Sequence, residues 1–139
     1  MKPITTALLV IQPGPLRNSL KSFLSTFPAI EVLAEARDMS VLWRLGRELR
    51  PDLIVIEAGL PGYGLDQERQ LAVILKRLKD ELPAARCLVL VENAEQHQAA
   101  EAAGADIVIF KGYRAPELVH CIEELLAPPA ALADSAGAN

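Results

Sequence analysis

A chain of 139 residues is long enough to bury a core as one domain, and its net charge of −4 argues against nucleic acid or an anionic membrane as the main partner. Aromatic residues make up 4% and apolar residues 51%, so the core must consist mainly of Leu, Ile, Val and Ala. The apolar run of residues 7–11 stops at Gln12, which is too short for a signal peptide or a membrane span. We therefore expect a cytoplasmic domain.

Five short segments in the chain are predicted strands. Residues 7–11 come first, and residues 30–36 follow, where Glu31 and Glu35 interrupt the apolar pattern and indicate an edge strand. The other three cover residues 53–56, 87–91 and 107–110. These last runs are unbroken, which is typical of parallel strands buried on both faces.

A helical stripe of apolar residues follows each predicted strand. The stripes cover residues 16–27, 41–49, 71–82, 99–103 and 118–126. Proline or glycine ends each one, and Asp38 or Ser40 is a candidate cap for the second. The alternation predicts a doubly wound α/β domain of the flavodoxin-like type, with a five-stranded parallel sheet and helices on both faces. We assign residues 1–127 to it and expect residues 128–139 to be a disordered tail or the start of a linker.

Three side chains bear on the core and on the redox environment. Cys87 and Cys121 lie far apart in apolar segments without a second cysteine nearby, which favours two buried thiols in a reducing cytosol. Trp43 lies on the second predicted helix, where we expect it in the core.

Ligands of such sheets bind beyond the carboxyl ends of the strands. The side chains found there are Gln12 and Pro13 after the first strand, Glu57 after the third, Val91 and Glu92 after the fourth, and Lys111 after the fifth. Three segments around these positions, residues 9–16, 51–62 and 104–111, resemble the response-regulator receiver domain. The resemblance covers residues 7–126 and implies the same fold.

The resemblance also implies which residues stand at the family's phosphorylation site. In that family an acidic pair after the first strand holds Mg²⁺, and an aspartate after the third accepts a phosphoryl group. A hydroxyl residue after the fourth strand and a lysine after the fifth assist. Gln12 and Pro13 replace the acidic pair, Glu57 replaces the acceptor, and Val91 (or Glu92, if the register shifts by one) replaces the hydroxyl residue. Only Lys111 and the turn of residues 60–62 are kept, so the resemblance implies a pseudo-receiver that has no metal, no cofactor and no enzymatic activity.

Glu57 has two interpretations. Its carboxylate lies about one methylene further out than that of aspartate, so it can act as a permanent mimic of the phosphorylated acceptor. Alternatively, it pairs with Lys111 so that neither charge is left uncompensated, since removing one partner of a buried pair costs about 3–5 kcal/mol. The second interpretation is favoured, because the family's switching aromatic is also replaced, by Val108.

The expected function is therefore recognition of a protein partner, which would be a regulator, a kinase, an output domain or a second copy of the chain. By resemblance, the contact surface lies on the fourth helix, fifth strand and fifth helix. Besides Lys111, it comprises Gln96, Ala99, Ala100, Ala103, Glu117, Val119 and Glu123. We expect no contact with nucleic acid or a membrane.

Two other functions remain open. A flavodoxin-like small-molecule binder would use the crevice near Gln12, Gly14, Glu57 and Lys111, although no phosphate-cradling loop or stacking aromatic lies at the strand ends. An active phosphorelay receiver that uses Glu57 is disfavoured, because the metal ligands are replaced.

Overall fold

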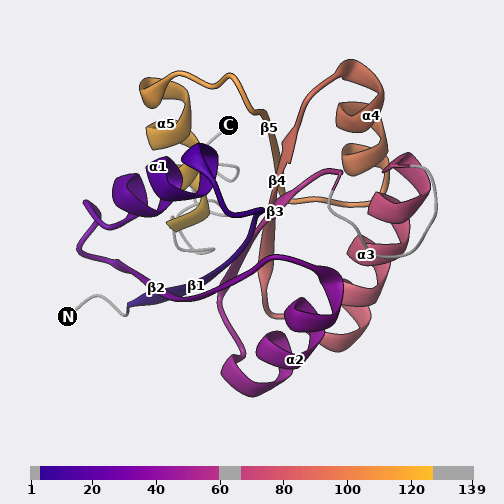
Figure 1. Ribbon diagram of the computed structural model, residues 1–139, viewed down its shortest axis with the longest axis horizontal. Coiled ribbons are helices and arrows are strands. Elements are labelled where there is room, and N and C mark those ends of the chain that lie inside the picture. Colours follow the sequence, from indigo (N-terminus) through magenta and orange to yellow (C-terminus); the bar gives the residue numbers. More distant parts are fainter. Residues whose placement is uncertain (1–3, 60–66, 127–139) are drawn as a thin grey trace, which may run out of the picture.

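The structure is a computed structural model that describes residues 4–59 and 67–126, so the predicted tail lies outside the described residues. The five strands are β1 (Thr5–Val10), β2 (Ile30–Ala36), β3 (Leu53–Glu57), β4 (Arg86–Val91) and β5 (Ile107–Phe110). The five helices are α1 (Pro15–Leu24), α2 (Met39–Leu49), α3 (Gln67–Glu81), α4 (Ala94–Ala102) and α5 (Ala115–Leu126) (Figure 1). Strands and helices alternate along the chain as predicted.

The strands form one parallel sheet in the order β2-β1-β3-β4-β5. This confirms the predicted doubly wound, flavodoxin-like fold and the edge position of β2. The centre of the sheet is β1, β3 and β4, whose apolar runs are buried on both faces. Because all strands are parallel, the residues that follow them meet at one edge.

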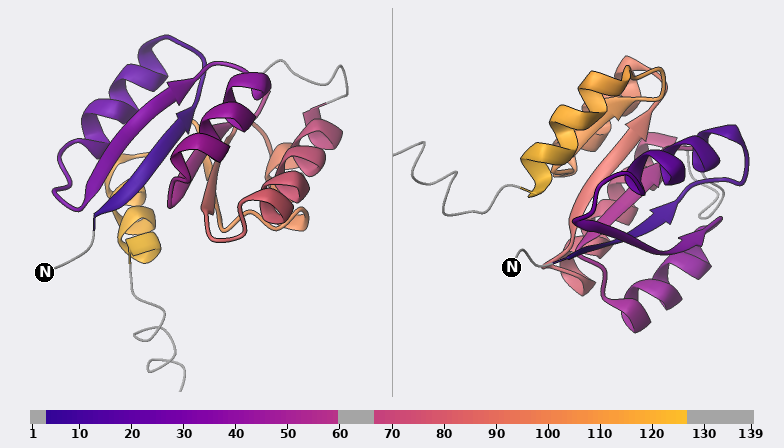
Figure 2. Two further views of the ribbon diagram at one scale, coloured as in Figure 1. Left: turned by 90° about the horizontal axis from the view of Figure 1, so that it is seen from below. Right: turned by 90° about the vertical axis from the view of Figure 1, so that its left-hand side faces the viewer.

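Helices cover both faces of the sheet (Figure 2). One buried cluster joins the sheet to α2, α3 and α4, and a second joins it to α1 and α5. Trp43 lies in the first cluster, as predicted, and the guanidinium of Arg77 lies 4.0 Å from the centre of its ring. The side chain therefore contributes apolar burial on one side and a cation–π contact on the other.

Local contacts explain why polar residues are tolerated at two element ends. Asp38 is the cap of α2: its carboxylate accepts a hydrogen bond from the Val41 N–H at 3.0 Å. This bond holds the pKa of Asp38 below its usual value. Glu35 on β2 lies 3.2 Å from Lys21 and 3.8 Å from Arg17, both on α1. A carboxylate can therefore interrupt the apolar pattern of this edge strand because α1 supplies cations.

The two thiols differ in exposure. Cys87 is buried, as predicted, but Cys121 on α5 is only half-buried, so the prediction of two buried thiols is wrong for Cys121. Residue 121 lies beside the inward-facing Leu118 and Ile122, at the border of the buried stripe of α5. Burial, and secondarily the nearby Asp106, raises the pKa of the Cys87 thiol. Cys87 therefore lacks both access and thiolate character.

We expect a thiol-alkylating reagent at neutral pH to label Cys121 and to spare Cys87 while the protein is folded. Intact mass, followed by peptide mapping, would then show one adduct in buffer and two in denaturant. The Cys121→Ser variant should take up no label until it unfolds. Labelling of native Cys87 at the rate of Cys121 would contradict the burial described above.

Candidate functional site: the carboxyl edge of the sheet

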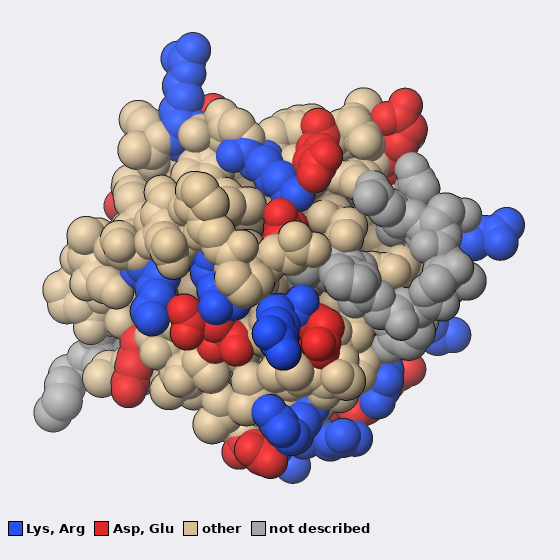
Figure 3. Space-filling model, in the orientation of Figure 1, with Lys and Arg blue, Asp and Glu red and all other residues tan. Residues whose placement is uncertain are grey.

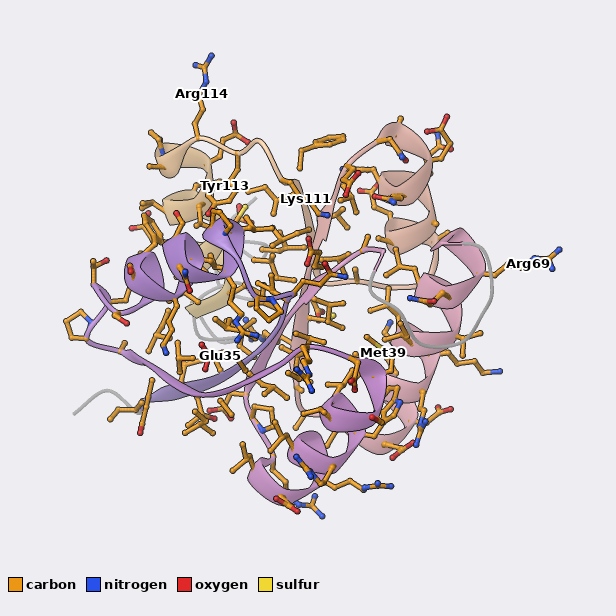
Figure 4. The ribbon with its side chains drawn as sticks, in the orientation of Figure 1. Glu35, Met39, Arg69, Lys111, Tyr113 and Arg114 are labelled. Atoms are coloured by element: carbon orange, nitrogen blue, oxygen red, sulfur yellow. The ribbon has the colours of Figure 1, made fainter. Side chains whose placement is uncertain are left out.

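The carboxyl ends of four strands bring together most of the predicted site residues. Lys111 follows β5 and lies between the α4 and α5 sides of the molecule (Figure 4). Its ammonium lies 2.8 Å from Glu57 Oε2 and 2.6 Å from Glu92 Oε1. The predicted pair of Glu57 and Lys111 is therefore confirmed, and Glu92 is a second carboxylate on the same cation.

Glu57 is held on both carboxylate oxygens. Oε1 accepts a hydrogen bond from the backbone N–H of Gln12 at 3.0 Å, while Oε2 contacts Lys111. The side chains of Glu57 and Lys111 are only 14% and 20% exposed. A charge-assisted contact at this depth is screened less than a surface ion pair, so it fixes both side chains.

The titration of Lys111 and Glu92 reflects these contacts. Burial alone would lower the pKa of Lys111, but the bonds to Glu57 and Glu92 outweigh it and raise that pKa above its usual value. The hydrogen bond from Lys111 lowers the pKa of Glu92. The ammonium and the Glu92 carboxylate are therefore both charged across the physiological pH range.

Three of the predicted site residues bring no side chain to the site. Val91 is fully buried in the cluster beneath α2, α3 and α4, so Glu92 rather than Val91 is the residue after β4 that reaches the site. Gln12 contributes its backbone N–H, and its side chain is exposed, as is Pro13. Because β4 is buried on both faces, the first polar side chain after it belongs to Glu92.

The residues of this edge do not fit a magnesium ion. Mg²⁺ requires several hard oxygen ligands in octahedral geometry, usually including carboxylates. Pro13 has no side-chain oxygen, and both oxygens of Glu57 are already bonded, one of them to a cation. Across residues 4–59 and 67–126 there is no group of three His, Cys, Asp or Glu side chains that could hold a metal. We derive no metal-dependent step for this site.

The structure corrects the predicted contact surface on α4. Gln96 is 1% exposed and Ala100 is fully buried, so neither can face a partner. The side-chain oxygen of Gln96 accepts a hydrogen bond from the backbone N–H of Glu92 at 2.7 Å. The backbone N–H of Gln96 donates to the side chain of the cap residue Asn93 at 2.8 Å. Gln96 thus fixes the connection from β4 to α4 and, through it, the position of Glu92.

The other predicted surface residues are more exposed, and the prediction omitted an aromatic side chain. Ala99 and Ala103 are partly buried against the core, Val119 is half-buried, and Glu117 and Glu123 are exposed. Phe110 at the end of β5 is 45% exposed, and its ring stacks on His97 of α4 at a centroid distance of 5.2 Å. Ile109 packs toward α1 and α5, so the next residue, Phe110, faces the α4 side; the unbroken apolar run of β5 gave no sequence signal of its exposure.

A surface pocket of about 470 Å³ lies beside the site, between α1 and the connection from β5 to α5. Its lining residues are Pro15, Leu16, Ser19, Phe23, Lys111, Tyr113 and Ala115. Lys111 is the one residue that it shares with the crevice predicted for a small molecule. Burial raises the pKa of the Tyr113 hydroxyl, so Tyr113 is a neutral hydrogen-bonding group at physiological pH.

The sheet order and the Lys111–Glu57 contact at its carboxyl edge define the class: this is the fold of response-regulator receiver domains. No family model matches the sequence. A two-component response regulator of the LuxR family from Aurantimonas sp. SI85-9A1 is 28% identical, with a TM-score of 0.75 over 88% of this chain and 85% of that chain. The response regulator domain of Thermotoga maritima CheB is 24% identical, with a TM-score of 0.69 over 91% and 99%.

A curated relative agrees with these structures. The protein-glutamate methylesterase/protein-glutamine glutaminase 3 of Myxococcus xanthus (strain DK1622) is 37% identical over 90 residues. The match covers 64% of this chain and 23% of that relative, so the chain spans less than a quarter of its length. Together with the sheet order, these likenesses show that the chain has the fold of the receiver domains of two-component response regulators. No helix in the described part of the chain is long and apolar enough to cross a membrane.

Proposed function

We propose that this receiver domain is a pseudo-receiver of the cytoplasm that recognises a protein partner without being phosphorylated. One observation carries the proposal: the Glu57 carboxylate is bonded to the Gln12 N–H and to Lys111, so neither oxygen is available to a phosphoryl donor. A glutamate in this state is part of the structure of the site. It does not act as its nucleophile.

The charges around Lys111 support the same proposal. A phosphoryl group entering this edge would carry about −2 charge at neutral pH. It would meet the carboxylates of Glu57 and Glu92. These two carboxylates already compensate the charge of Lys111, the cation that they share. Without a metal ion to offset this repulsion, transfer to Glu57 is unfavourable.

The partner is a regulator, a kinase or an output domain, and recognition is the whole activity of the domain, with no catalysed reaction. The surface on α4, β5 and α5 would be its docking face. The exposed residues Glu117, Glu123 and Phe110 are its most accessible side chains there.

We expect incubation with acetyl phosphate and Mg²⁺ to leave the intact mass of the chain unchanged. Beryllofluoride with Mg²⁺ should likewise leave the melting temperature unchanged, because both reagents need a free carboxylate and a metal. Glu57→Gln is the matched control, since it removes the carboxylate but keeps the shape of the side chain. A Mg²⁺-dependent adduct that maps to Glu57 and disappears in Glu57→Gln would contradict the proposal.

The pocket of about 470 Å³ beside Lys111 favours a second candidate, a small-molecule-binding domain. Pockets of this volume hold small ligands when a few polar groups converge on them, and here Ser19, Tyr113 and Lys111 are such groups. The absorbance spectrum of the purified protein distinguishes the two. A band beyond the aromatic absorption would indicate a bound cofactor, whereas the pseudo-receiver should show protein absorption alone.

A further inference from the structure

The charge of the chain is divided unevenly across the fold, because acidic residues are concentrated at the β5 edge of the sheet, where α4 and α5 lie. Helices α4 and α5 contain no lysine or arginine. They carry the five carboxylates of Glu95, Glu101, Glu117, Glu123 and Glu124. By contrast, α1 carries Arg17 and Lys21 and no acidic residue. Since the whole chain has a net charge of −4, the side formed by α4, β5 and α5 accounts for its acidity.

We call this side the β5 face, formed by α4 (Ala94–Ala102), β5 (Ile107–Phe110) and α5 (Ala115–Leu126). Figure 3 shows acidic side chains over α4 and basic side chains gathered over α2. The connection from β5 to α5 contains the exposed cation Arg114, which points away from the body of the molecule (Figure 4). The β5 face is therefore acidic on both of its helices. The two cations between them are Arg114 and Lys111, and Lys111 is already paired with Glu57 and Glu92.

An exposed aromatic ring lies on the strand between these acidic helices. Phe110 is 45% exposed, and in the described residues it is the one aromatic among the exposed large apolar side chains. His97 stacks on one face of the ring and lies 3.2 Å from Glu101. Phe110 is thus held in position while much of its surface remains available, and aromatic side chains, Phe included, are enriched at protein interfaces.

The geometry points to a basic, amphipathic segment of a partner protein as the occupant of the β5 face. An apolar side chain of that segment would cover Phe110, and its lysines or arginines would lie against the carboxylates of α4 and α5. The inference rests on the proposed function and specifies the chemistry of the partner. Complementary charge of this kind speeds association and selects among partners, while the aromatic anchor supplies affinity.

The same charges argue against a second copy of the chain on this face. A two-fold interface would place each α4 and α5 opposite the same helices of the other copy, so that five carboxylates face five. Like charges directly opposed across an interface are unfavourable. Nucleic acid and anionic lipid are disfavoured by the same repulsion.

The experiment uses two synthetic probes, helical peptides of about 18 residues, or five turns. Both have leucines on one face, and the polar face is lysine in one and glutamate in the other. We expect the lysine peptide to bind ¹⁵N-labelled protein saturably, with amide shifts confined to α4, β5 and α5. The glutamate peptide should not bind. Raising the salt concentration should weaken the lysine complex without abolishing it, because salt screens the charge pairs but not the apolar contact with Phe110.

Two variants and two matched controls assign the contacts. Phe110→Ala should weaken binding of the lysine peptide about tenfold, and Val73→Ala, an equally exposed apolar residue on α3, should leave it unchanged. The double variant Glu117→Gln/Glu124→Gln should weaken binding several-fold. Glu31→Gln/Glu48→Gln, which removes two exposed carboxylates from β2 and α2, should not.

Each outcome decides the inference. Three results would overturn it. They are equal losses of peptide binding in the variants and their controls, amide shifts centred on another face, and a dimer in solution held by α4 and α5. These failures would leave the phosphorylation result untouched. Conversely, binding of the lysine peptide that appears only after beryllofluoride is added would contradict the proposed function while supporting the docking face.

Discussion

Replacing Lys111 with methionine is expected to lower the free energy of unfolding by about 2–3 kcal/mol, and replacing Glu57 with glutamine by about 1 kcal/mol. The two losses differ because the structure gives Lys111 two carboxylates and Glu57 one cation. Without Lys111, two carboxylates face each other at a half-dry edge. Without the Glu57 charge, Lys111 still has Glu92.

The double variant should be more stable than the sum of the single losses implies, because the one carboxylate that loses its partner, Glu92, is 59% exposed to solvent. Denaturant unfolding of the four proteins gives the coupling energy directly. Lys76→Met, an exposed lysine on α3, is the matched control and should change stability little. A coupling energy of zero would mean that Glu57 acts independently of Lys111, and the mimic interpretation of Glu57 would then gain support.

The pH dependence of the same coupling has a definite sign. The folded-state pKa of Lys111 is raised above its ordinary value of 10.5, so its contribution to stability is fully present below that pH. It should be lost as the pH rises through the higher folded-state value. The coupling energy between Glu57 and Lys111 should therefore disappear only in strongly alkaline solution.

Replacing Gln96 with alanine is expected to cost about 2–3 kcal/mol, which is an effect usually reserved for core residues. The change empties a fully enclosed site and removes the acceptor for the Glu92 N–H. Chemical denaturation measures the loss. Gln98→Ala is the matched control at an exposed position of the same helix. It makes the same favourable change in helix propensity as Gln96→Ala but should not destabilise the fold.

A result in which the two glutamine variants are equally stable would contradict the role given to Gln96. Because Gln96 holds the start of α4, its loss should also weaken the contact between Glu92 and Lys111. A double variant with Glu92→Gln would then show less than additive loss.

The sequence predicted the sheet well because the signals that mark each strand and helix lie within that strand or helix or directly beside it. Apolar runs, prolines after helices and the strand-end rule suffice to place Glu57 and Lys111 at the same edge of the sheet. Glu92 was placed at the correct strand end, but only as an alternative to Val91. The choice depends on which way the last residue of β4 points, and a strand buried on both faces offers no alternation from which to predict it.

Helix α4 is where prediction from the sequence failed. Its residues, AEQHQAAEA, offer only the short alanine stripe of the predicted helix 99–103, which is too weak a pattern to indicate its inner face. The interior side turned out to be built from Gln96 and Ala100, and the buried glutamine is tolerated because its polar atoms have partners. Phe110 was missed as an anchor for the opposite reason: a phenylalanine in an apolar strand predicts burial.

The late position of Lys111 in the chain affects the order in which the domain can be completed during synthesis. Domains emerge from the ribosome with their amino-terminal part first. When residues up to Val91 have emerged, the strand β3 and its Glu57 can already pair with β1 and β4. Lys111, the cation that lies 2.8 Å from Glu57, has yet to be made. The charges at the carboxyl edge of the sheet are therefore compensated last, when β5 pairs with β4 and places Lys111 between the carboxylates of Glu57 and Glu92.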